Sequence, residues 1–587
     1  MLRSKTCGEL NKTDVSATVT LAGWVHRRRD HGSLIFLDVR DRYGITQCVV
    51  NATENERAHR TASDVRNEFV VQVKGIVRER PSGTVNKNLP TGEIEVVIGE
   101  IAILNESKTP PFYVNEDSEV DELLRMKFRY VDLRRPSRQR FIEVRHEFVK
   151  YLRDFFSARG FWEVETTQLI RSDPTGARDF IVPSRYFPGK FWALPQSPQQ
   201  LKQILMVGGI DRYFQIARIF RDEDPRADRI YEATQLDVEM SFPERDDVMA
   251  IGEEAYTGAL ERFGRKPVWR KPWPRMKYDD VMDRYGSDRP DLRFDLPLVD
   301  VTDTFRGTKF QAFRAGVDAG AVKALLIKGQ ADVSRKGIDV MTELAKRRGG
   351  KGLVHIGLTA EGLRSPVAKF FSDDEQKDLV RRVGASLGDL ILIVADAQAH
   401  TAARALGEVR DHLGTQLDLI DDTTYRCVWV TDFPVLDRTP EGGWTFAHNP
   451  FSGVLESDVH LLDTDPGAAR SKQYDMVIDG REIGGGSIRI HKRALQEKIF
   501  ALMGTPKEEA AQRFGALLDA LEYGAPPHGG FATGIDRSVM LLTGTANIRD
   551  TIAFAKTQTG YDPLLDAPAD VDPALLEQLR LRVLPPK

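Results

Sequence analysis

The sequence lacks several features that define other classes of protein. Its 587 residues include only three cysteines, Cys7, Cys48 and Cys427, which are far apart and odd in number. Such a set argues against a disulfide framework or a structural zinc site and is typical of a reducing compartment, so we expect a cytoplasmic protein. No apolar run reaches the roughly 18 to 20 residues that a membrane span needs. The first residues also lack the apolar core of a signal peptide.

A strong excess of either charge is absent as well. Lys and Arg total 83 and Asp and Glu total 87, which gives a formal net charge of −4. A nucleic-acid partner would therefore have to be held by local patches, because no global basic field attracts it. Hydrophobic residues make up 41% of the chain, which is typical of a soluble globular protein. The length predicts three or four domains rather than one core.

The N-terminal part of the chain is predicted to be a β-barrel. Five β-branched stretches are separated by Gly, Asp or Pro, and they lie at residues 19–25, 33–39, 45–50, 69–77 and 94–98. Five short strands of this kind suit a small closed barrel such as an OB-fold. We therefore predict an OB-fold domain over residues 1–107.

The rest of the chain is predicted to be an α+β region with an insertion. Apolar residues recur every three or four positions over 137–159, which predicts a long amphipathic helix, with Ser137 as its N-cap, Gly160 as its C-cap and a strand at 161–165. Residues 288–418 have helical patterns rich in Ala and Gly around a buried strand at 389–395. The expected segments are a barrel at 1–107, a hinge at 108–136, a core at 137–287, an insertion domain at 288–418, a second part of the core at 419–555 and a C-terminal extension at 556–587.

Two segments in the first part of the core carry polar groups suited to a small charged ligand. Ser197, Gln199 and Lys202 lie in Gln196–Gln203 and combine hydroxyl, amide and ammonium groups, although taken alone they also suit an ordinary polar helix start. Farther on, the charged run "FRDEDPRADR" at 220–229 follows an apolar stretch, and "TQLDVEM" at 234–240 places alternate polar residues on one face. We predict an antiparallel hairpin with a charged tip.

Two glycine-rich segments in the second part of the core suit an anionic ligand. The first holds Glu482, Gly484–Gly486 and Arg489, and we expect its glycines to let a ligand approach the backbone and its arginine to clamp a carboxylate. The second, 529–542, is a glycine-rich strand followed by an apolar helix with Arg537 at its start. A helix N-terminus with an added cation favours a phosphate.

These segments, taken in order, resemble the class II aminoacyl-tRNA synthetases. The strings "QSPQ", "FRDED", "RADR", "TQLDVEMSF", "GGGSIRIH" and "GIDR" are similar to those of bacterial-type aspartyl-tRNA synthetases, as are "GWVHRRRDHGSLIFLDVRDR" and "PTGEIEV" in the barrel. The resemblance covers nearly the whole chain, including the insertion. It implies an antiparallel-sheet catalytic core that activates L-aspartate with ATP and Mg²⁺ and transfers it to tRNA(Asp). It also implies a cytoplasmic homodimer built through the apolar face of the helix at 137–159 and the strand that follows it.

The resemblance also implies roles for individual residues of the core. The implied catalytic residues are Arg221, Glu482 and Arg537. The implied aspartate-binding residues are Thr175, Ser197, Gln199, Lys202, Arg221, Asp237, His448 and Arg489. The implied ATP-binding residues are Arg221, Asp222, Glu223, Gln235, Glu482, Gly534, Ile535, Asp536 and Arg537, and the implied magnesium ligands are Asp475 and Glu482.

In the barrel the resemblance implies an anticodon-binding face. Phe36 would stack on a base, while Arg29, Gln47 and Glu95 would read base edges, as OB-folds do with splayed single strands. His31 and Gly83 are the types found in relatives that also charge tRNA(Asn), so tRNA(Asn) is an expected second substrate. A histidine can donate or accept a hydrogen bond and could satisfy either C or U at the third anticodon base.

Several positions depart from the family pattern and leave alternatives open. Thr167 stands where a proline is usual, Thr175 replaces a glutamate, and Ile230 and Ala233 replace a glutamine and a phenylalanine near ATP. One alternative is a non-catalytic tRNA-binding paralogue, which these departures would favour. Another is an asparaginyl- or lysyl-tRNA synthetase, which Arg489 and Lys202 disfavour because both suit an acidic substrate side chain.

Overall fold

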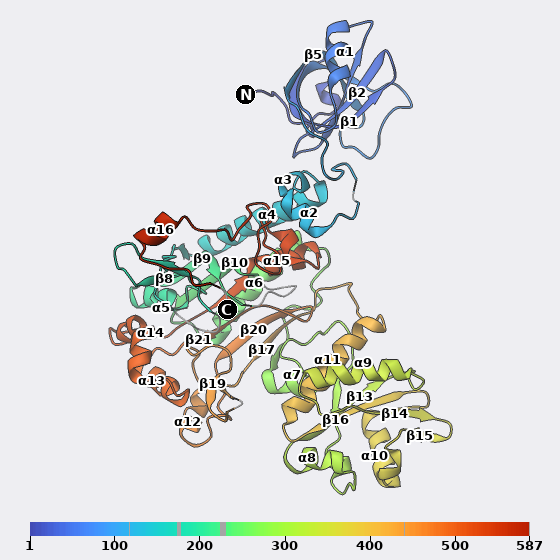
Figure 1. The fold of residues 1–587 in the computed structure, drawn as a ribbon. Coiled ribbons are helices and arrows are strands. Elements are labelled where there is room, and N and C mark those ends of the chain that lie inside the picture. Colours follow the sequence, from blue (N-terminus) through green and yellow to red (C-terminus); the bar gives the residue numbers. More distant parts are fainter. Residues whose placement is uncertain (117, 173–177, 224–229, 440, 586–587) are drawn as a thin grey trace. The chain divides into compact units, whose positions relative to one another are not determined.

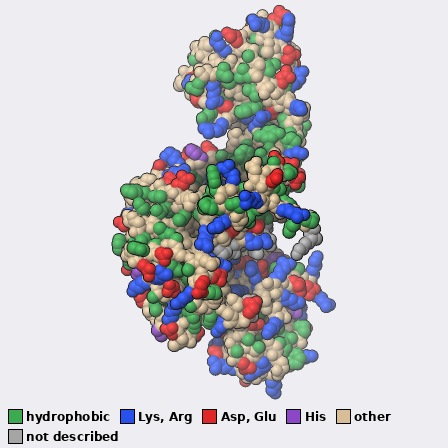
Figure 2. Space-filling view, turned by 60° about the vertical axis from the view of Figure 1, so that its left-hand side comes forward, with side chains coloured by type: hydrophobic (Ala, Val, Ile, Leu, Met, Phe, Trp, Pro, Cys, Tyr) green, Lys and Arg blue, Asp and Glu red, His purple; other side chains and the backbone are tan. Residues whose placement is uncertain are grey.

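The computed structural model describes residues 1–116, 118–172, 178–223, 230–439 and 441–585 (Figure 1). They form two compact units, each described by itself here. One consists of Met1–Arg145 and Asn547–Val571 with Pro225–Arg229, and the other of His146–Asp224, Ile230–Ala546 and Asp572–Lys587. Within the described ranges, no helix is both long and apolar enough to cross a membrane. The face drawn in Figure 2 carries both acidic and basic side chains, which is consistent with the small net charge.

The first unit begins with the predicted five-stranded barrel. Its strands close in the order β1-β2-β3-β5-β4. They are β1 (Thr18–Asp30), β2 (Leu34–Arg40), β3 (Ile45–Asn51), β4 (Val70–Glu79) and β5 (Ile94–Asn105), with helix α1 (Glu56–Asp64) between β3 and β4. Alternate residues such as Leu21, Val39 and Val73 fill the interior and are fully buried. The barrel prediction is confirmed, although β1 and β5 run farther than the apolar pattern indicated.

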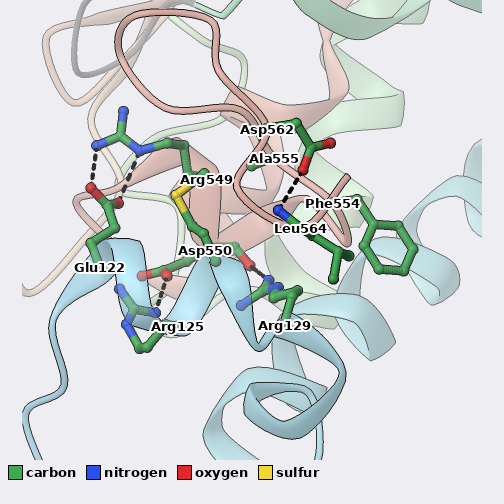
Figure 3. Close-up of a pocket in the computed structure, with 10 residues that line it drawn as sticks. Glu122, Arg125, Arg129, Arg549, Asp550, Phe554, Ala555, Asp562 and Leu564 are labelled. Carbon is green, nitrogen blue, oxygen red and sulfur yellow. Dashed lines mark hydrogen bonds and ion pairs between the residues drawn. The ribbon is translucent and has the colours of Figure 1, made fainter. Parts of the chain in front are cut away.

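The same unit contains the hinge helices and the segment 547–571. The helices are α2 (Glu122–Lys127) and α3 (Arg129–Asp132). Figure 3 shows them fastened to this segment by charged contacts: Arg549 pairs with Glu122 at 2.9 Å, and Arg125 donates to Asp550 at 3.0 Å. On the barrel side, the buried Glu68 accepts hydrogen bonds from Arg40 and from Arg134, which lies two residues before the long helix α4. Arginine–carboxylate pairs therefore join three parts of this unit.

Helix α4 (Pro136–Ser157) is the predicted amphipathic helix, with one error at its start. Ser137 is its second residue and not its N-cap, because Pro136, whose fixed φ and missing N–H suit a first turn, already lies in the helix. Gly160 follows the C-terminus with φ +77°, which fits its predicted role at that end. The apolar residues Phe148 and Leu152 are fully buried within the chain. This face is therefore not left for a partner subunit.

The second unit is organised around an eight-stranded sheet. The strand order is β11-β17-β20-β21-β22-β10-β9-β6, with antiparallel pairing from β17 to β9 and parallel pairing at both edges. The strands are β6 (Trp162–Glu163), β9 (Arg212–Phe220), β10 (Glu232–Ser241), β11 (Arg275–Lys277), β17 (Cys427–Thr431), β20 (Gln473–Ile478), β21 (Arg481–Ile488) and β22 (His528–Gly534). The pairing of β9 with β10 confirms the predicted hairpin, whose tip at 224–229 lies outside the described residues.

The second unit also contains helices, some of which pack on this sheet, and short additional strands. The helices are α5 (Gln199–Val207), α6 (Arg245–Phe263), α7 (Tyr278–Tyr285), α12 (Leu461–Thr464), α13 (Arg493–Leu502), α14 (Lys507–Ala520), α15 (Ile535–Thr543) and α16 (Pro573–Gln578). The short strands are β7 (Ile181–Pro183), β8 (Phe191–Ala193), β18 (Leu436–Arg438) and β19 (Trp444–Phe446). An ideal Cβ on Gly252 of α6 would lie 3.4 Å from Trp429 and 3.5 Å from Met476, so α6 packs closely on the sheet.

A separate sheet forms within the predicted insertion. Its antiparallel order is β12-β13-β16-β14-β15. The elements are β12 (Leu298–Asp300), β13 (Ala321–Ile327), β14 (Val354–Thr359), β15 (Gly362–Arg364), β16 (Leu390–Asp396), α8 (Gln311–Ala319), α9 (Arg335–Arg347), α10 (Asp373–Val383) and α11 (Ala399–Gln416). Leu392 packs in one apolar cluster with α9 and α11, and Ile393 packs in another with α8 and α10. Both sheet faces are therefore covered, as a continuous apolar strand requires.

Candidate functional site

A buried cluster of two cations and two carboxylates lies among α5, β10 and the end of β21. Lys202 Nζ is 3.1 Å from Asp237 Oδ1 and 3.3 Å from Glu239 Oε2. Arg489 donates to both oxygens of Glu239, with Nε at 2.9 Å and Nη2 at 3.2 Å. None of the four residues is more than 4% exposed. Because opposite charges are matched, the cluster is neutral as a whole.

The surroundings shift the two carboxylates in opposite directions. Burial alone would raise the pKa of Glu239, but Arg489 and Lys202 outweigh it and lower that pKa. Burial prevails at Asp237 and raises its pKa, since Lys202 offsets only part of the desolvation. Asp237 Oδ2 is buried without a hydrogen-bond partner among the described residues. The cluster therefore presents an unsatisfied acceptor that a cationic group of a ligand could meet.

The predicted polar residues of α5 lie at the start of that helix, beside the cluster. Ser197 Oγ accepts a hydrogen bond from the backbone N–H of Gln199 at 3.3 Å. The side chain of Gln199 is turned to Gln203, to whose Oε1 it donates at 3.0 Å. Thr175, the other residue expected to contact an amino acid, lies outside the described residues.

A second polar group forms where β20 and β21 pair irregularly. A register shift between Met476 and Val477 accompanies the pairing of these two strands. Ligand atoms of His448, Asp475 and Glu482 all lie within 4.8 Å of one another. Two carboxylates so close together suit a hard divalent cation such as Mg²⁺, which prefers oxygen ligands. His448, expected to lie over an amino acid, is placed beside these carboxylates.

The electrostatics of this second group favour positive charge beside the two carboxylates. Burial and then the neighbouring charge of Asp475 raise the pKa of Glu482. Burial would lower the pKa of His448, but Asp475, whose Oδ2 is 3.2 Å from Nε2, raises it to about 9. The carboxylates therefore favour bound positive charge, whether from a protonated imidazole or from a cation.

The three glycines of β21 lie in close contact with neighbouring groups of the protein. An ideal Cβ on Gly484 or Gly486 would lie 2.2 Å from the carbonyl oxygen of Ala532 or 2.1 Å from that of Gly530. On Gly485 it would lie 2.3 Å from Asp475 Oδ1. These glycines let neighbouring strands and the Asp475 carboxylate approach β21, so room for a ligand is not needed to explain them.

Two predicted arginines lie at the ends of secondary-structure elements. Arg221 directly follows β9, and its Nε donates to the carbonyl oxygen of Gln196 at 3.4 Å. Arg537, in the first turn of α15, donates to the backbone carbonyl of Glu482 at 2.6 Å. Both are partly exposed, so a ligand can reach them from solvent. Asp222 and Glu223 follow Arg221 at the start of the charged run.

The remaining predicted ATP-binding residues surround the junction of β22 and α15. Gln235 on β10 pairs with Gly534, the last residue of β22. Asp536 is buried, and its carboxylate accepts from the backbone N–H of Thr234 at 2.8 Å, which ties α15 to β10. The side chain of Ile535 is fully buried, which leaves only its backbone to meet a ligand.

The barrel brings its predicted residues together in an open hollow. Arg29 donates to Asp38 and, at 3.0 Å, to Gln47 Oε1, and Gln47 in turn donates to Glu95 at 2.7 Å. The Arg29 guanidinium and the His31 ring each lie 5.8 Å from the ring centre of Phe36. These residues line one hollow with Arg78 and Arg80. Gly83 lies in the 80–84 loop with φ +84°, where a side chain would be strained.

Sequence reasoning missed three residues of the core site. Glu239 shares the alternating face of β10 with Asp237, and that alternation could have identified it. Gln203, one residue after Lys202, contacts His528 across 325 positions of sequence. No local sequence pattern distinguishes Gln203 or His528 from an ordinary buried residue.

Comparisons with known proteins agree with this geometry. A family model described as "tRNA synthetases class II (D, K and N)" matches residues 121–558, and one described as "OB-fold nucleic acid binding domain" matches residues 19–104. An aspartate–tRNA(Asp/Asn) ligase of Moorella thermoacetica is 51% identical over 583 residues, covering 99% of this chain and 96% of that protein. An aspartate–tRNA ligase of Geobacillus kaustophilus is 49% identical over 590 residues and is covered completely, as is this chain.

Solved structures support the fold at lower sequence identity. An aspartyl-tRNA synthetase from Entamoeba histolytica is 16% identical with a TM-score of 0.59, covering 94% of this chain and 92% of that one. An asparaginyl-tRNA synthetase from Pyrococcus horikoshii, complexed with asparaginyl-adenylate, is 19% identical with a TM-score of 0.57, covering 95% and 99%. The predicted combination of a barrel with an antiparallel core is thereby confirmed.

The contact between Gly485 and Asp475 gives a test of the cation site. We expect Gly485→Ala to displace the Asp475 carboxylate, because the new Cβ would lie 2.3 Å from Oδ1. Affinity for Mn²⁺, titrated by electron paramagnetic resonance, should fall by about tenfold or more. Gly515→Ala is the matched control, since its Cβ meets nothing within 4 Å on α14. Unchanged Mn²⁺ affinity in a folded Gly485→Ala variant would contradict the assignment.

Proposed function

The chain belongs to the class II tRNA synthetases for aspartate, lysine and asparagine and is an aspartate–tRNA ligase, and we propose that its buried Lys202–Asp237–Glu239–Arg489 cluster selects the amino acid. This cluster is the observation that carries the proposal. L-Aspartate has a side-chain carboxylate for Arg489 and Lys202 and an ammonium group for Asp237 Oδ2. Relatives named as aspartate–tRNA ligases match the chain over nearly its whole length.

The proposed first step is attack of the aspartate α-carboxylate on the α-phosphorus of ATP. Pyrophosphate leaves and aspartyl-adenylate forms, so negative charge gathers on phosphate oxygens. Arg221, after β9, and Arg537, at the N-terminus of α15, come from different elements and provide fixed positive charge for those oxygens. The nucleophile is already an anion, so little acid–base chemistry is required. The 3′ end of tRNA then takes the aspartyl group from the adenylate, and AMP leaves.

The described residues fit a magnesium ion with ATP. Asp475 and Glu482 would hold it, with His448 beside them, and the short distances among the three groups support this assignment. A bound Mg²⁺ would neutralise phosphate charge. The residues of this chain would supply the orientation, because Gly485 lets the Asp475 carboxylate lie against β21.

The rival readings are less well supported. Asparagine and lysine lack a side-chain carboxylate, so neither would offer Arg489 and Lys202 the additional anionic partner that aspartate offers. A paralogue without catalytic activity would have no need of Arg221 and Arg537 together with a carboxylate pair. The departures at Thr167, Thr175, Ile230 and Ala233 leave these charged residues intact.

Pyrophosphate exchange tests the specificity. We expect exchange of labelled pyrophosphate into ATP that depends on aspartate and magnesium and needs no tRNA. Arg489→Lys keeps the charge but loses the two-point pairing with Glu239, so kcat/KM for aspartate should fall by about 100-fold, or ~2.7 kcal/mol. Arg493→Lys, a partly exposed arginine four residues on, should change little. Exchange with asparagine or lysine but none with aspartate would refute the proposal.

We further propose that the barrel hollow binds the anticodon and accepts tRNA(Asn) as well as tRNA(Asp). Phe36 offers a ring for stacking, and Arg29, Gln47 and Glu95 offer donors and acceptors beside it. The edge-to-face contact of His31 with Phe36 places an imidazole next to the stacking ring. That imidazole can donate to one base and accept from another.

Charging assays with transcripts of tRNA(Asp) and tRNA(Asn) test whether the enzyme accepts both. We expect kcat/KM values for tRNA(Asp) and tRNA(Asn) to lie within about 100-fold of each other, or ~2.7 kcal/mol. His31→Leu removes the two-way hydrogen-bonding group and should lower charging of tRNA(Asn) more than that of tRNA(Asp). The exposed His460, in the other unit, provides the control variant His460→Leu. A larger preference for tRNA(Asp) in the unmodified enzyme would overturn the proposal.

A two-fold homodimer is also proposed, through a surface other than the buried apolar face of α4. Strand β6 is an edge of the large sheet, and its Trp162 is 65% exposed. Exposed Phe191 and Trp192 on β8 add apolar surface, and a second copy could cover these side chains. Light scattering at micromolar concentration should show a dimer, and Trp162→Glu should weaken it. A monomer of the unmodified protein would contradict this.

A further inference from the structure

Three buried side chains form a hydrogen-bonded chain from β22 to the start of α5. His528 Nε2 lies 3.2 Å from Gln203 Nε2, and Gln203 Oε1 lies 3.0 Å from Gln199 Nε2. His528 and Gln203 are fully buried, and Gln199 is 7% exposed. His528 also belongs to the aspartate site through its backbone, since its carbonyl oxygen accepts the N–H of Arg489 at 2.9 Å.

The surroundings of His528 fix which ring nitrogen carries the hydrogen. Nδ1 lies 2.8 Å from the carbonyl oxygen of Pro526, and only an N–H can face a carbonyl oxygen at that distance. Nε2 is therefore an acceptor in the neutral ring. Burial lowers the pKa of His528, which keeps the ring neutral, while Glu239 opposes this effect and Arg489 and His491 reinforce it.

The ring in turn dictates the orientation of two amides. An acceptor at Nε2 requires the NH₂ group of Gln203, so the oxygen of Gln203 must point toward Gln199. That oxygen requires the NH₂ group of Gln199. The remaining polar atom, Gln199 Oε1, receives no hydrogen bond from a described residue. The opposite ring tautomer would reverse both amides and present an N–H group there instead.

We propose that His528 is a positioning residue that acts through Gln203 to hold Gln199 with its amide oxygen as an acceptor for the ammonium group of substrate aspartate. This inference rests on the proposed function. It assigns a second acceptor to the ammonium group beside the unsatisfied Asp237 Oδ2. An NH₂ group in that place would oppose the ammonium group, so the state of a ring that need not touch substrate controls how well aspartate binds.

Two conservative substitutions separate this role from packing. His528→Gln can keep an acceptor where Nε2 faces Gln203, whereas His528→Asn can keep a donor toward Pro526 but is too short to reach Gln203. We expect His528→Asn to raise KM for aspartate about tenfold, with KM for ATP within threefold of the unmodified enzyme. His528→Gln should stay within threefold for both substrates. Equal effects of the two variants on KM for aspartate, or equal effects on aspartate and ATP, would overturn the proposal.

A spectroscopic measurement keeps the proposal testable even where a variant fails to fold. Nitrogen-15 NMR of the histidine-labelled, unmodified enzyme distinguishes the two neutral tautomers, and the His528 signal can be assigned by its loss in either variant. We expect the hydrogen on Nδ1, and a hydrogen on Nε2 would overturn the inference. Absence of aspartate-dependent exchange in the unmodified enzyme would instead refute the proposed function, while the tautomer would still be measurable.

Discussion

The pairing of Arg489 with Glu239 is the interaction on which the core depends. Both groups are buried, so separating them would leave an uncompensated charge in a medium that solvates charge poorly. The pair fixes the end of β21 relative to β10, with β22 between them in the sheet. Such a pair adds little net stability compared with apolar residues of similar volume. Under the proposed function its value is specificity, since a cation already held in place needs little rearrangement to meet a carboxylate.

The same sheet links the proposed amino-acid pocket to the proposed magnesium carboxylates. Arg489 donates to Ser487, and Ser487 contacts Ser452 at 3.0 Å. Ser452 Oγ also lies 3.5 Å from Gln473 Oε1, and the amide nitrogen of Gln473 donates to Asp475 at 3.1 Å. Every member of this series is buried, so each must keep its partners or leave a polar group unsatisfied. The tight glycines of β21 belong to the same constraint, because they allow the strands to approach closely enough for these short side chains to meet.

The secondary-structure elements that could be predicted from the sequence are those with a residue pattern within the segment itself. Alternating β-branched residues predict the barrel strands, and the spacing of Phe148 and Leu152 predicts α4. The predicted start of α4 was wrong, because Pro136 already lies inside the helix that Ser137 was expected to cap. Alternation on β10 placed Asp237 on the correct face, although Glu239, two residues on, was given no role. Contacts between distant segments, such as Arg489 with Glu239 across 250 positions, leave no trace in either segment alone.

The hydrogen-bonded chain of His528, Gln203 and Gln199 shows why such distant contacts matter for chemistry. In Gln199 the sequence identifies an amide, which can donate or accept equally well. Only the neighbours of an amide decide which of these it does, and here those neighbours are Gln203 and His528. By contrast, an ionised carboxylate such as that of Asp237 can only accept hydrogen bonds, and a lysine ammonium group can only donate them. Specificity for an ammonium group can therefore be predicted from charged residues alone, but the contribution of an amide needs the fold that orients it.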